Sequence, residues 1–385
     1  MNKKILILGG AGFIGQHLTR ALLKAGNTVR ILDNFSEQVH IIKTLPFDLY
    51  ENVDLIRGDI RDRNLMRQAL IGIDSVVNLA AETGTGQSMY EIERYFSVNV
   101  QGTAILIDLL QNDDVGHSVQ SVVIASSRAV YGEGAYRCDN HGMIFPSQRT
   151  KSLMSNGYFE PLCPVCGCSV FLIPTPESAP FMPTSMYGLT KQVQEQAVLL
   201  FANTRGINGF GLRYQNVYGP GQSLKNPYTG ILAVFSNLAR QNHSIEIYED
   251  GKESRDFVYI DDVVDATIRC INHTGKFVGP LNVGSGHSTS VMTVAEEIKS
   301  FFKSESKITT TGKFRMGDIR HNKADLNLVE KVLGFEPAIS FKQGLSNFLG
   351  WASLQEHEDA ASYLRSVAEL SSKGLMGAHF IESND

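Results

Sequence analysis

The chain has 385 residues, of which 43% are hydrophobic and 19% charged, and its formal net charge is −5. This length and composition predict a large buried core in one large or two medium domains. The mild acidity and the lack of a basic block argue against nucleic acid as a partner. No apolar run approaches the roughly 20 residues that span a bilayer, and the run at residues 5–8 is too short for a secretory signal. We therefore expect a soluble cytoplasmic protein with no membrane partner.

Short apolar runs alternate with helical patterns through the first half of the chain. Near-continuous apolar runs of this kind are typical of parallel strands that are buried on both faces. Alternating strands and helices predict right-handed crossovers and a doubly wound, Rossmann-type sheet of the α/β class. The predicted strands are KILILGG (4–10), TVRILD (28–33), VDLIRGD (53–59), SVVNLAA (75–81) and SVVIASS (121–127), with a helix at GQHLTRALLKAG (15–26).

The alternation stops between residues 135 and 183. This segment holds seven of the 12 prolines and shows no helical periodicity, so we interpret it as an inserted module. The pattern resumes with a predicted helix at 187–204, a strand at GFGLRY (209–214) and a later helix at 291–302. The last thirty or so residues look helical and then frayed.

Four of the five cysteines lie within the inserted segment. Cys138 and His141 stand three residues apart, as do Cys163 and Cys166, which is a spacing typical of zinc ligands. Four protein ligands would form a closed tetrahedral shell, as in structural zinc sites, whereas catalytic zinc keeps a position open for water. We predict a structural zinc site in a zinc-ribbon-like module. Free thiols, or a ligand set that includes Cys168, are the alternatives.

A glycine-rich turn, Gly9-x-x-Gly12-x-x-Gly15, follows the first predicted strand and precedes the first helix. The backbone at such a turn can approach a pyrophosphate, and the helix N-terminus supplies amide donors. Asp33 ends the second strand, where its carboxylate would accept both ribose hydroxyls and repel a 2′-phosphate. The pattern therefore predicts a dinucleotide site that favours NAD over NADP. We expect further cofactor contacts from Phe13, Ile14, Asn34, Asp59, Ile60, Leu79, Ala80 and Ala81.

A candidate proton-transfer set follows from YGLTK (187–191) and SSRAVYG (126–132). Tyr187 and Lys191 are four residues apart on a predicted helix and hence share a face. An ammonium group and a positively charged nicotinamide would lower the pKa of a tyrosine toward working pH. Ser127, at the end of the fifth strand, could hold a reacting oxygen between itself and Tyr187.

These motifs resemble the extended short-chain dehydrogenase/reductases that act on nucleotide sugars, the NAD-dependent epimerase/dehydratase family. The resemblance covers residues 4–349 outside the inserted segment and includes RYQNVYGPGQ (213–222) and SRDFVYIDDV (254–263). It implies Ser127, Tyr187 and Lys191 as the catalytic set, a smaller substrate lobe, NAD as cofactor and a homodimer formed through two helices. Further residues follow from it: Asn99, Tyr214 and Val217 beside the cofactor, with Tyr187 and Lys191 touching it as well, and Asn216, Arg255 and Arg315 at the sugar diphosphate.

The two residues that follow Ser127 limit the reactions that are possible. Dehydratases of this family carry an Asp-Glu pair there, to move the protons of water loss, whereas this chain has Arg128 and Ala129. We therefore expect 4-epimerisation, in which Tyr187 takes the 4-hydroxyl proton, NAD takes the C4 hydride, and hydride returns to the opposite face of the 4-keto sugar. Glu82 and Thr83 are the expected sugar contacts, with Ser127.

The insertion resembles that of a subgroup that interconverts dTDP-L-rhamnose and dTDP-6-deoxy-L-talose, and a dTDP-6-deoxyhexose is the expected substrate. A 4-ketosugar reductase that consumes NAD(P)H, a UDP-hexose 4-epimerase and a non-catalytic binding protein are the alternatives.

The expected domains follow from these motifs. We assign 1–134 and 184–213, with part of 255–275, to the NAD-binding Rossmann domain, and 135–183 to the inserted zinc-ribbon-like module. Residues 214–254 and 276–349 form the expected nucleotide-sugar lobe, and 350–385 a C-terminal helical tail.

Overall fold

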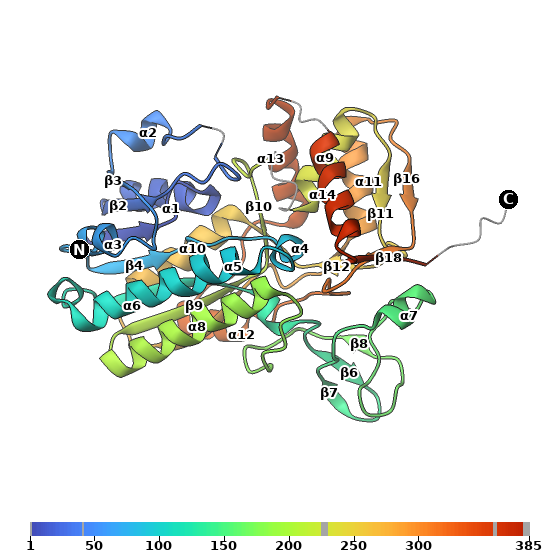
Figure 1. Cartoon of the computed structure of the whole chain (residues 1–385), viewed down its shortest axis with the longest axis horizontal. Coiled ribbons are helices and arrows are strands. Elements are labelled where there is room, and N and C mark those ends of the chain that lie inside the picture. The colour runs from blue at the N-terminus through green and yellow to red at the C-terminus, as the bar shows by residue number, and fades with distance from the viewer. Residues whose placement is uncertain (1, 41, 225–229, 357–359, 380–385) are drawn as a thin grey trace.

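The computed structural model describes residues 2–40, 42–224, 230–356 and 360–379. Its centre is a parallel sheet of seven strands in the order β14-β9-β5-β4-β1-β2-β3 (Figure 1). The α/β fold class and the five predicted strands of the first half are confirmed, together with the strand at β9. The strands are β1 (Lys4–Leu8), β2 (Thr28–Asp33), β3 (Asp54–Arg57), β4 (Ser75–Asn78), β5 (Ser121–Ser127), β9 (Asn208–Tyr214) and β14 (Val278–Val283).

Helices cover both faces of this sheet, which explains why its strands are apolar almost throughout. On one face, Leu6 and Val122 of the sheet pack with Leu106 and Val198 from helices α6 and α8. On the other face, Ile5 and Val123 pack with Leu18 of α1 and Val263 of α10. The first layer comprises α3 (Arg63–Leu70), α6 (Gly102–Asn112) and α8 (Met186–Arg205), and the second α1 (Phe13–Lys24), α10 (Ile260–Asn272) and α12 (Asn327–Leu333).

Strands β1 and β4 are neighbours in the sheet. The chain continues from β1 to β2 and β3 on one side of this pair, and from β4 to β5 and β9 on the other, so the strand order reverses between β1 and β4. In doubly wound sheets, ligands bind at the carboxyl ends of the strands at such a reversal. Gly9 and Ala80 lie in the loops after β1 and β4, and Ser127 is the last residue of β5; all three are predicted site residues. The topology therefore brings the predicted cofactor and catalytic segments to one edge of the sheet.

Strand β14 differs from the expected division of the chain. Residues 276–349 were assigned to the sugar lobe, but β14 pairs in parallel with β9 over six residues and forms the edge of the central sheet. The covering helix α10 packs against α1, as the assignment of part of 255–275 to the sheet domain requires. The sheet domain therefore extends to Val283.

A smaller lobe follows the sheet domain, at the upper right of Figure 1. Its core is formed by helices α9, α11 and α13, with two parallel strands, β11 and β16, beside them. Two short pairs, β10 with β13 and β12 with β15, connect the lobe to the sheet domain. The elements are β10 (Asn216–Tyr218), α9 (Ile231–Arg240), β11 (Ile245–Ile247), β12 (Ser254–Arg255), β13 (Phe257–Tyr259), β15 (Thr289–Ser290), α11 (Val291–Phe302), β16 (Ile308–Thr310) and β17 (Lys313–Arg315).

The inserted segment forms a small sheet that projects below the lobe in Figure 1. Strand β6 (Tyr136–Cys138) pairs antiparallel with β7 (Gly142–Ile144) and β8 (Phe171–Leu172). Its core is a small cluster of Tyr136, Ile144 and two cysteines, Cys138 and Cys163. A short helix, α7 (Lys151–Ser155), lies within the segment although the sequence shows no helical periodicity there.

The C-terminal segment contains the expected helix, but it returns to the lobe and ends in a short strand. Helix α13 (Phe341–Ser353) begins before the expected boundary, α14 (Ala360–Ser372) follows, and β18 (Met376–Ala378) pairs antiparallel with β17. The expected frayed end is thus wrong as far as residue 379. Among the described residues, no helix combines the length and the apolar character needed to cross a membrane.

The remaining elements are short and connect the layers. They are the helices α2 (Phe47–Tyr50), α4 (Thr85–Ser88) and α5 (Ile92–Tyr95), a π-helical stretch at Phe96–Gln101, and 3₁₀ turns at Asp114–Gly116 and Arg128–Tyr131.

Candidate active site

The glycine-rich turn has the geometry of a phosphate-binding loop. Gly9 has φ +74°, and a Cβ at this residue would lie 2.7 Å from the backbone nitrogen of Ala80. A Cβ on Gly15 would lie 2.6 Å from the carbonyl oxygen of Gly10. Gly12 is the N-cap residue of α1, and this cap makes no side-chain hydrogen bond. Free amide groups at a helix N-terminus bind anions, so the turn fits the pyrophosphate of a dinucleotide.

Asp33 lies buried at the end of β2, beside this turn. Its two carboxylate oxygens accept hydrogen bonds from the backbone amides of Ala11, at 2.9 Å, and Phe35, at 2.8 Å. Each oxygen keeps a further lone pair, which fits the two ribose hydroxyls that the sequence analysis expected. Asn34, Asp59, Ile60 and Ala80 line the adjoining cavity with Asp33. The ion pair from Asp59 to Arg61, at 2.7 Å, keeps the pKa of Asp59 below its usual value.

A second cavity of about 810 Å³ continues from the glycine turn to the end of β5. It brings together the turn, the predicted proton-transfer set and the segment after β9, which lie far apart in the sequence. Trp351 of α13 and Gln222 border it from the lobe side. The predicted residues that line it are Gly9, Gly12, Phe13, Ile14, Gly15, Leu79, Ala81, Thr83, Ser127, Tyr187, Lys191, Tyr214 and Val217.

Tyr187 and Ser127 meet in this cavity from α8 and β5. Burial raises the pKa of Tyr187, while a hydrogen bond with the Ser127 side chain and the positive charge of Arg128 act in the opposite direction. The sequence analysis expected Lys191 to lower this pKa. The Lys191 ammonium lies 6.0 Å from the centre of the Tyr187 ring, and Arg128, which follows Ser127 directly, is a further cation within electrostatic range of the phenol.

Lys191 is buried on the same face of α8 as Tyr187. Its ammonium donates to the carbonyl oxygen of Ala125 at 2.8 Å and lies 6.0 Å from the centre of the Tyr187 ring. Burial lowers the pKa of Lys191 to about 7. A single carbonyl uses only one of the three ammonium donors, so Lys191 can bind further oxygens in the cavity.

Two predicted contacts occupy different places from those expected. Asn99 is fully buried and lies outside both cavities. It donates to the Glu82 carbonyl oxygen, at 3.1 Å, and to Thr190 Oγ1, at 2.9 Å, so it connects the loop after β4 to the helix that carries Tyr187 and Lys191. The Glu82 carboxylate pairs with Arg94 at 2.8 Å and lines the Asp33 cavity, not the one that holds Tyr187. Thr83 does line the Tyr187 cavity.

A third, smaller cavity lies at the lobe and contains the three residues expected at the diphosphate. Asn216, Arg255 and Arg315 line it together with Asp318. Asn216 Oδ1 is buried without a hydrogen-bond partner among the described residues. Arg255 pairs with Asp318 at 3.2 Å, and the Arg315 guanidinium lies 4.8 Å from the centre of the Tyr248 ring. Burial raises the pKa of Asp318, but Arg255, Arg315, Arg128 and Arg149 together keep it below its usual value. Glu246, Glu249 and Glu253 also line this cavity, so acidic and basic side chains meet in it.

The four predicted metal ligands converge in the inserted segment. Their ligand atoms all lie within 4.8 Å of one another. Cys138 Sγ is 3.7 Å from Cys166 Sγ and 3.6 Å from His141 Nδ1, and Cys163 Sγ is also 3.6 Å from His141 Nδ1. Tetrahedral zinc at ordinary bond lengths gives edges of about 3.8 Å between sulfurs and about 3.6 Å from sulfur to nitrogen. Cys168 is exposed and lies outside this group.

Arg128 and Asp318 are the site residues that the sequence analysis missed. Arg128 was noted only because it replaces an acid, and Asp318 lies within RMGDIRH (315–321), where only Arg315 was expected at the site. Arg128 Nη1 is buried without a hydrogen-bond partner in the described part of the chain. Its position directly after Ser127 was the available signal, since it places a buried cation near Tyr187 and Asp318.

Comparison with known proteins agrees with this geometry. The model of the NAD dependent epimerase/dehydratase family matches residues 5–149 and 167–284, so the chain belongs to this family of enzymes. It is 36% identical over 351 residues to a dTDP-L-rhamnose 4-epimerase of Burkholderia thailandensis, covering 91% of this chain and 94% of the relative. It is 29% identical to a putative UDP-glucose 4-epimerase of Methanocaldococcus jannaschii, covering 90% and 97%.

Solved structures share the fold. A UDP-glucose 4-epimerase of Thermotoga maritima with UDP-glucose aligns with TM-score 0.72 and 26% identity, over 91% of this chain and 98% of that one. MoeE5 in complex with UDP-glucuronic acid and NAD aligns with TM-score 0.71 and 27% identity, over 91% and 99%. The family model leaves residues 150–166 unmatched, within the inserted segment.

Proposed function

We propose that this protein is an NAD-dependent nucleotide-sugar 4-epimerase that acts on a dTDP-6-deoxyhexose. The observation that carries the proposal is the meeting of Ser127, Tyr187 and Lys191 in one cavity with the glycine turn. The positions that hold an acid pair in dehydratases carry Arg128 and Ala129 instead. This chain therefore lacks, after Ser127, the acid and base that water elimination needs.

Each residue of the set has a role that follows from its chemistry. Tyr187 takes the proton of the sugar 4-hydroxyl as general base and returns it later. Ser127 holds that oxygen beside the phenol, and the positive charge of Arg128 favours the phenolate form of Tyr187. Lys191 binds oxygens of the cofactor side with its free ammonium donors. The glycine turn and the Tyr187 cavity would hold NAD, which would supply the hydride acceptor and donor for C4.

The cofactor would be held by residues of the first two cavities. Asp33 accepts the ribose hydroxyls and disfavours a 2′-phosphate, while the amides at the start of α1 bind the pyrophosphate. Tyr214 and Val217 border the nicotinamide end of the cavity. Asn216, Arg255 and Arg315 would bind the sugar diphosphate, because arginine donors match phosphate oxygens.

The choice of sugar nucleotide rests on similarity. The Burkholderia thailandensis relative, at 36% identity, is named for dTDP-L-rhamnose, and its 4-epimer is dTDP-6-deoxy-L-talose. A UDP-hexose is the second candidate, since relatives at lower identity are named for UDP sugars. We also infer a homodimer, on the family resemblance alone.

The function is tested by proton NMR of the products formed from a panel of dTDP- and UDP-sugars. We expect C4 epimers, most rapidly from dTDP-L-rhamnose, without net oxidation or reduction. Tyr187→Phe should lower turnover at least about a hundredfold because it removes the general base, with the circular dichroism spectrum unchanged. Formation of a reduced sugar that consumes added NADH would instead identify a 4-ketosugar reductase.

We further propose that Cys138, His141, Cys163 and Cys166 bind a structural zinc ion. The support is their closed four-ligand arrangement, with sulfur and nitrogen separations that fit the edges of a zinc tetrahedron. The inserted strands bury few apolar side chains, and small modules of this kind need a metal or disulfide to fold. The proton-transfer set is complete without the metal, so the proposed zinc ion has no role in the chemistry.

Metal analysis of the purified protein tests this proposal. We expect about one zinc per chain. Cys166→Ser should lower the zinc content to a small fraction of this value, whereas Cys168→Ser, a matched change two residues away, should leave it unaltered. Fully folded wild-type protein without zinc would contradict the proposal, and equal loss in both variants would contradict the ligand set.

A further inference from the structure

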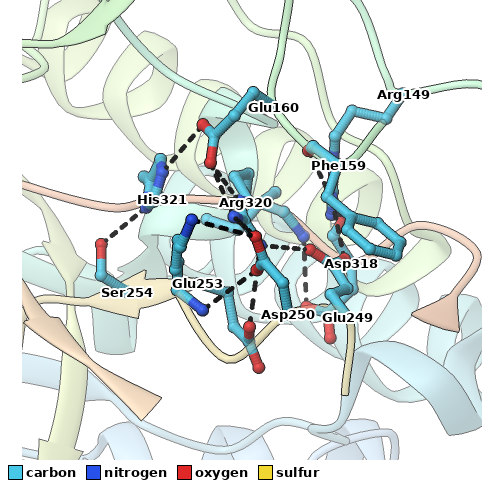
Figure 2. Close-up of polar contacts among 12 residues, drawn as sticks. Arg149, Phe159, Glu160, Glu249, Asp250, Glu253, Ser254, Asp318, Arg320 and His321 are labelled. Atoms are coloured by element: carbon cyan, nitrogen blue, oxygen red, sulfur yellow. Dashed lines mark hydrogen bonds and ion pairs between the residues drawn. The ribbon is translucent and has the colours of Figure 1, made fainter. Parts of the chain in front are cut away.

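Two buried arginines connect the inserted segment to the sugar lobe. Arg149 belongs to the insertion, and its side chain is only 4% exposed. It donates to the Glu249 carboxylate of the lobe at 2.7 Å and to the Asp318 carbonyl oxygen at 3.0 Å (Figure 2). It also donates to Glu133 at 2.9 Å and to the Phe159 carbonyl oxygen at 3.0 Å. The guanidinium thus joins three parts of the chain in a buried setting.

Arg320 makes the second connection, from the lobe toward the insertion. Its side chain is fully buried and donates to Glu160 of the insertion at 2.6 and 2.8 Å, and to Glu249 at 2.8 Å. The second oxygen of Glu160 lies 3.1 Å from His321 Nε2 (Figure 2). Glu160 therefore holds two consecutive residues of the lobe.

The loop that these contacts hold, residues 318–321, also positions Arg255. The Arg255 guanidinium donates to the Arg320 carbonyl oxygen at 3.1 Å, to the Ser254 carbonyl oxygen at 2.9 Å and to the Asp318 carboxylate at 3.2 Å. His321 Nδ1 lies 2.8 Å from Ser254 Oγ. Two of these three contacts of Arg255 are made by the loop, so displacement of the loop would move the guanidinium.

We propose that the inserted segment sets the affinity for the nucleotide diphosphate by holding the 318–321 loop, and through it Arg255. This inference rests on the proposed function, in which Arg255 binds the diphosphate. Arg149 and Glu160 are positioning residues and do not touch substrate. Arg320 also pairs with Glu249 at 2.8 Å and with Asp250 at 2.7 Å, so its charge stays paired without Glu160. Loss of the Glu160 carboxylate would instead remove the contacts that connect residues 320 and 321 to the inserted segment. The Tyr187 cavity contains neither Arg149 nor Glu160, so the proton-transfer steps should be unaffected.

The test compares Glu160→Gln with wild-type full-length protein. Glu160 is half exposed, so the variant should fold. We expect KM for the sugar nucleotide and Kd for dTDP, measured by calorimetry, to rise about tenfold, the size of one charge-assisted hydrogen bond. The kcat and the affinity for NAD should change less than about twofold. Arg149→Lys, which keeps the charge but loses the planar fork, should give an effect in the same direction.

Asp265→Asn is the matched control, because Asp265 forms an exposed ion pair with Arg269 at 2.7 Å on α10, away from the loop. It should leave KM, Kd and kcat unchanged. Unaltered dTDP affinity in both Glu160→Gln and Arg149→Lys would overturn the inference even if the wild type is a 4-epimerase. A loss of kcat or NAD affinity equal to the loss of dTDP affinity would overturn it as well, since it would indicate general destabilisation. Absence of wild-type epimerase activity would instead contradict the proposed function. In that case, the Kd for UDP in place of dTDP would be compared between the wild type and the two variants to test the role of the loop.

Discussion

At the scale of single residues, two cations flank Tyr187 and have different surroundings. Lys191 is buried with one carbonyl partner, and burial lowers its pKa to about 7. Arg128 stays charged near neutral pH although burial lowers its pKa to about 10. Because a phenolate is stabilised by any nearby positive charge, Arg128 supplies a permanent contribution, whereas that of Lys191 varies with pH.

Arg128→Met should move the pH dependence of catalysis. Tyr187 acts as a base only when deprotonated, and the charge of Arg128 lowers its pKa. Removing this charge raises that pKa, so the acidic limb of kcat/KM should shift to higher pH by about one unit. Arg137→Met, a change at an exposed arginine of the insertion, should leave the profile in place. An unshifted limb in Arg128→Met would show that Arg128 does not act on Tyr187.

Sequence patterns were sufficient for residues whose chemistry is local. Gly9 and Gly15 could be predicted because the backbone leaves no room for a Cβ, and Tyr187 and Lys191 because helical spacing places them on one face. The side-chain partner of Glu82 could not be predicted, since Arg94 approaches it from the next helix. The effect of Arg128 on Tyr187 could not be predicted either, because it depends on side-chain rotamers and burial, which sequence spacing does not define.

At the scale of elements, helix α8 is fixed to strands β5 and β9 by a buried ion pair. Glu195 of α8 and Arg213 of β9 are 2.6 Å apart and at most 2% exposed, and Glu195 also accepts from Ser126, next to Ser127. Glu195→Ala should lower the free energy of unfolding by about 3–5 kcal/mol, because it leaves a buried arginine unpaired. Urea unfolding measures this value. Gln196→Ala, at the exposed neighbouring residue, should change it by less than about 0.5 kcal/mol, and equal effects would contradict the role of the pair.

Strands that belong to the regular alternation of strands and helices were easier to predict than strands whose partners lie far away in the sequence. β1 to β5 alternate with helices and follow the order of a doubly wound sheet, so their arrangement followed from the pattern. β14 reaches the sheet only after a long excursion through the lobe, and β18 pairs with β17 about sixty residues earlier. Nothing in their short apolar runs indicates the partner, which is decided by packing.

At the scale of the whole molecule, the cavity that contains Tyr187 is closed from two sides. The sheet domain supplies the glycine turn and the proton-transfer set, and Trp351 and Gln222 border the cavity from the lobe. The inserted segment contacts the lobe at the 318–321 loop, at Glu249 and at strand β18, and none of its residues lines this cavity. Under the proposed function, the three parts divide cofactor binding, sugar-nucleotide binding and positioning of the diphosphate cations between them.

The account predicts a reaction in which the hydrogen at C4 leaves and returns within one turnover. The most direct measurement is epimerisation of dTDP-L-rhamnose in D₂O by the protein as purified, with NAD but no reductant added, followed by NMR of the product. We predict the C4 epimer with its original hydrogen at C4, because only the hydroxyl proton held by Tyr187 exchanges with solvent. Deuterium at C4, or product that forms only while added NADH is consumed, would contradict the account.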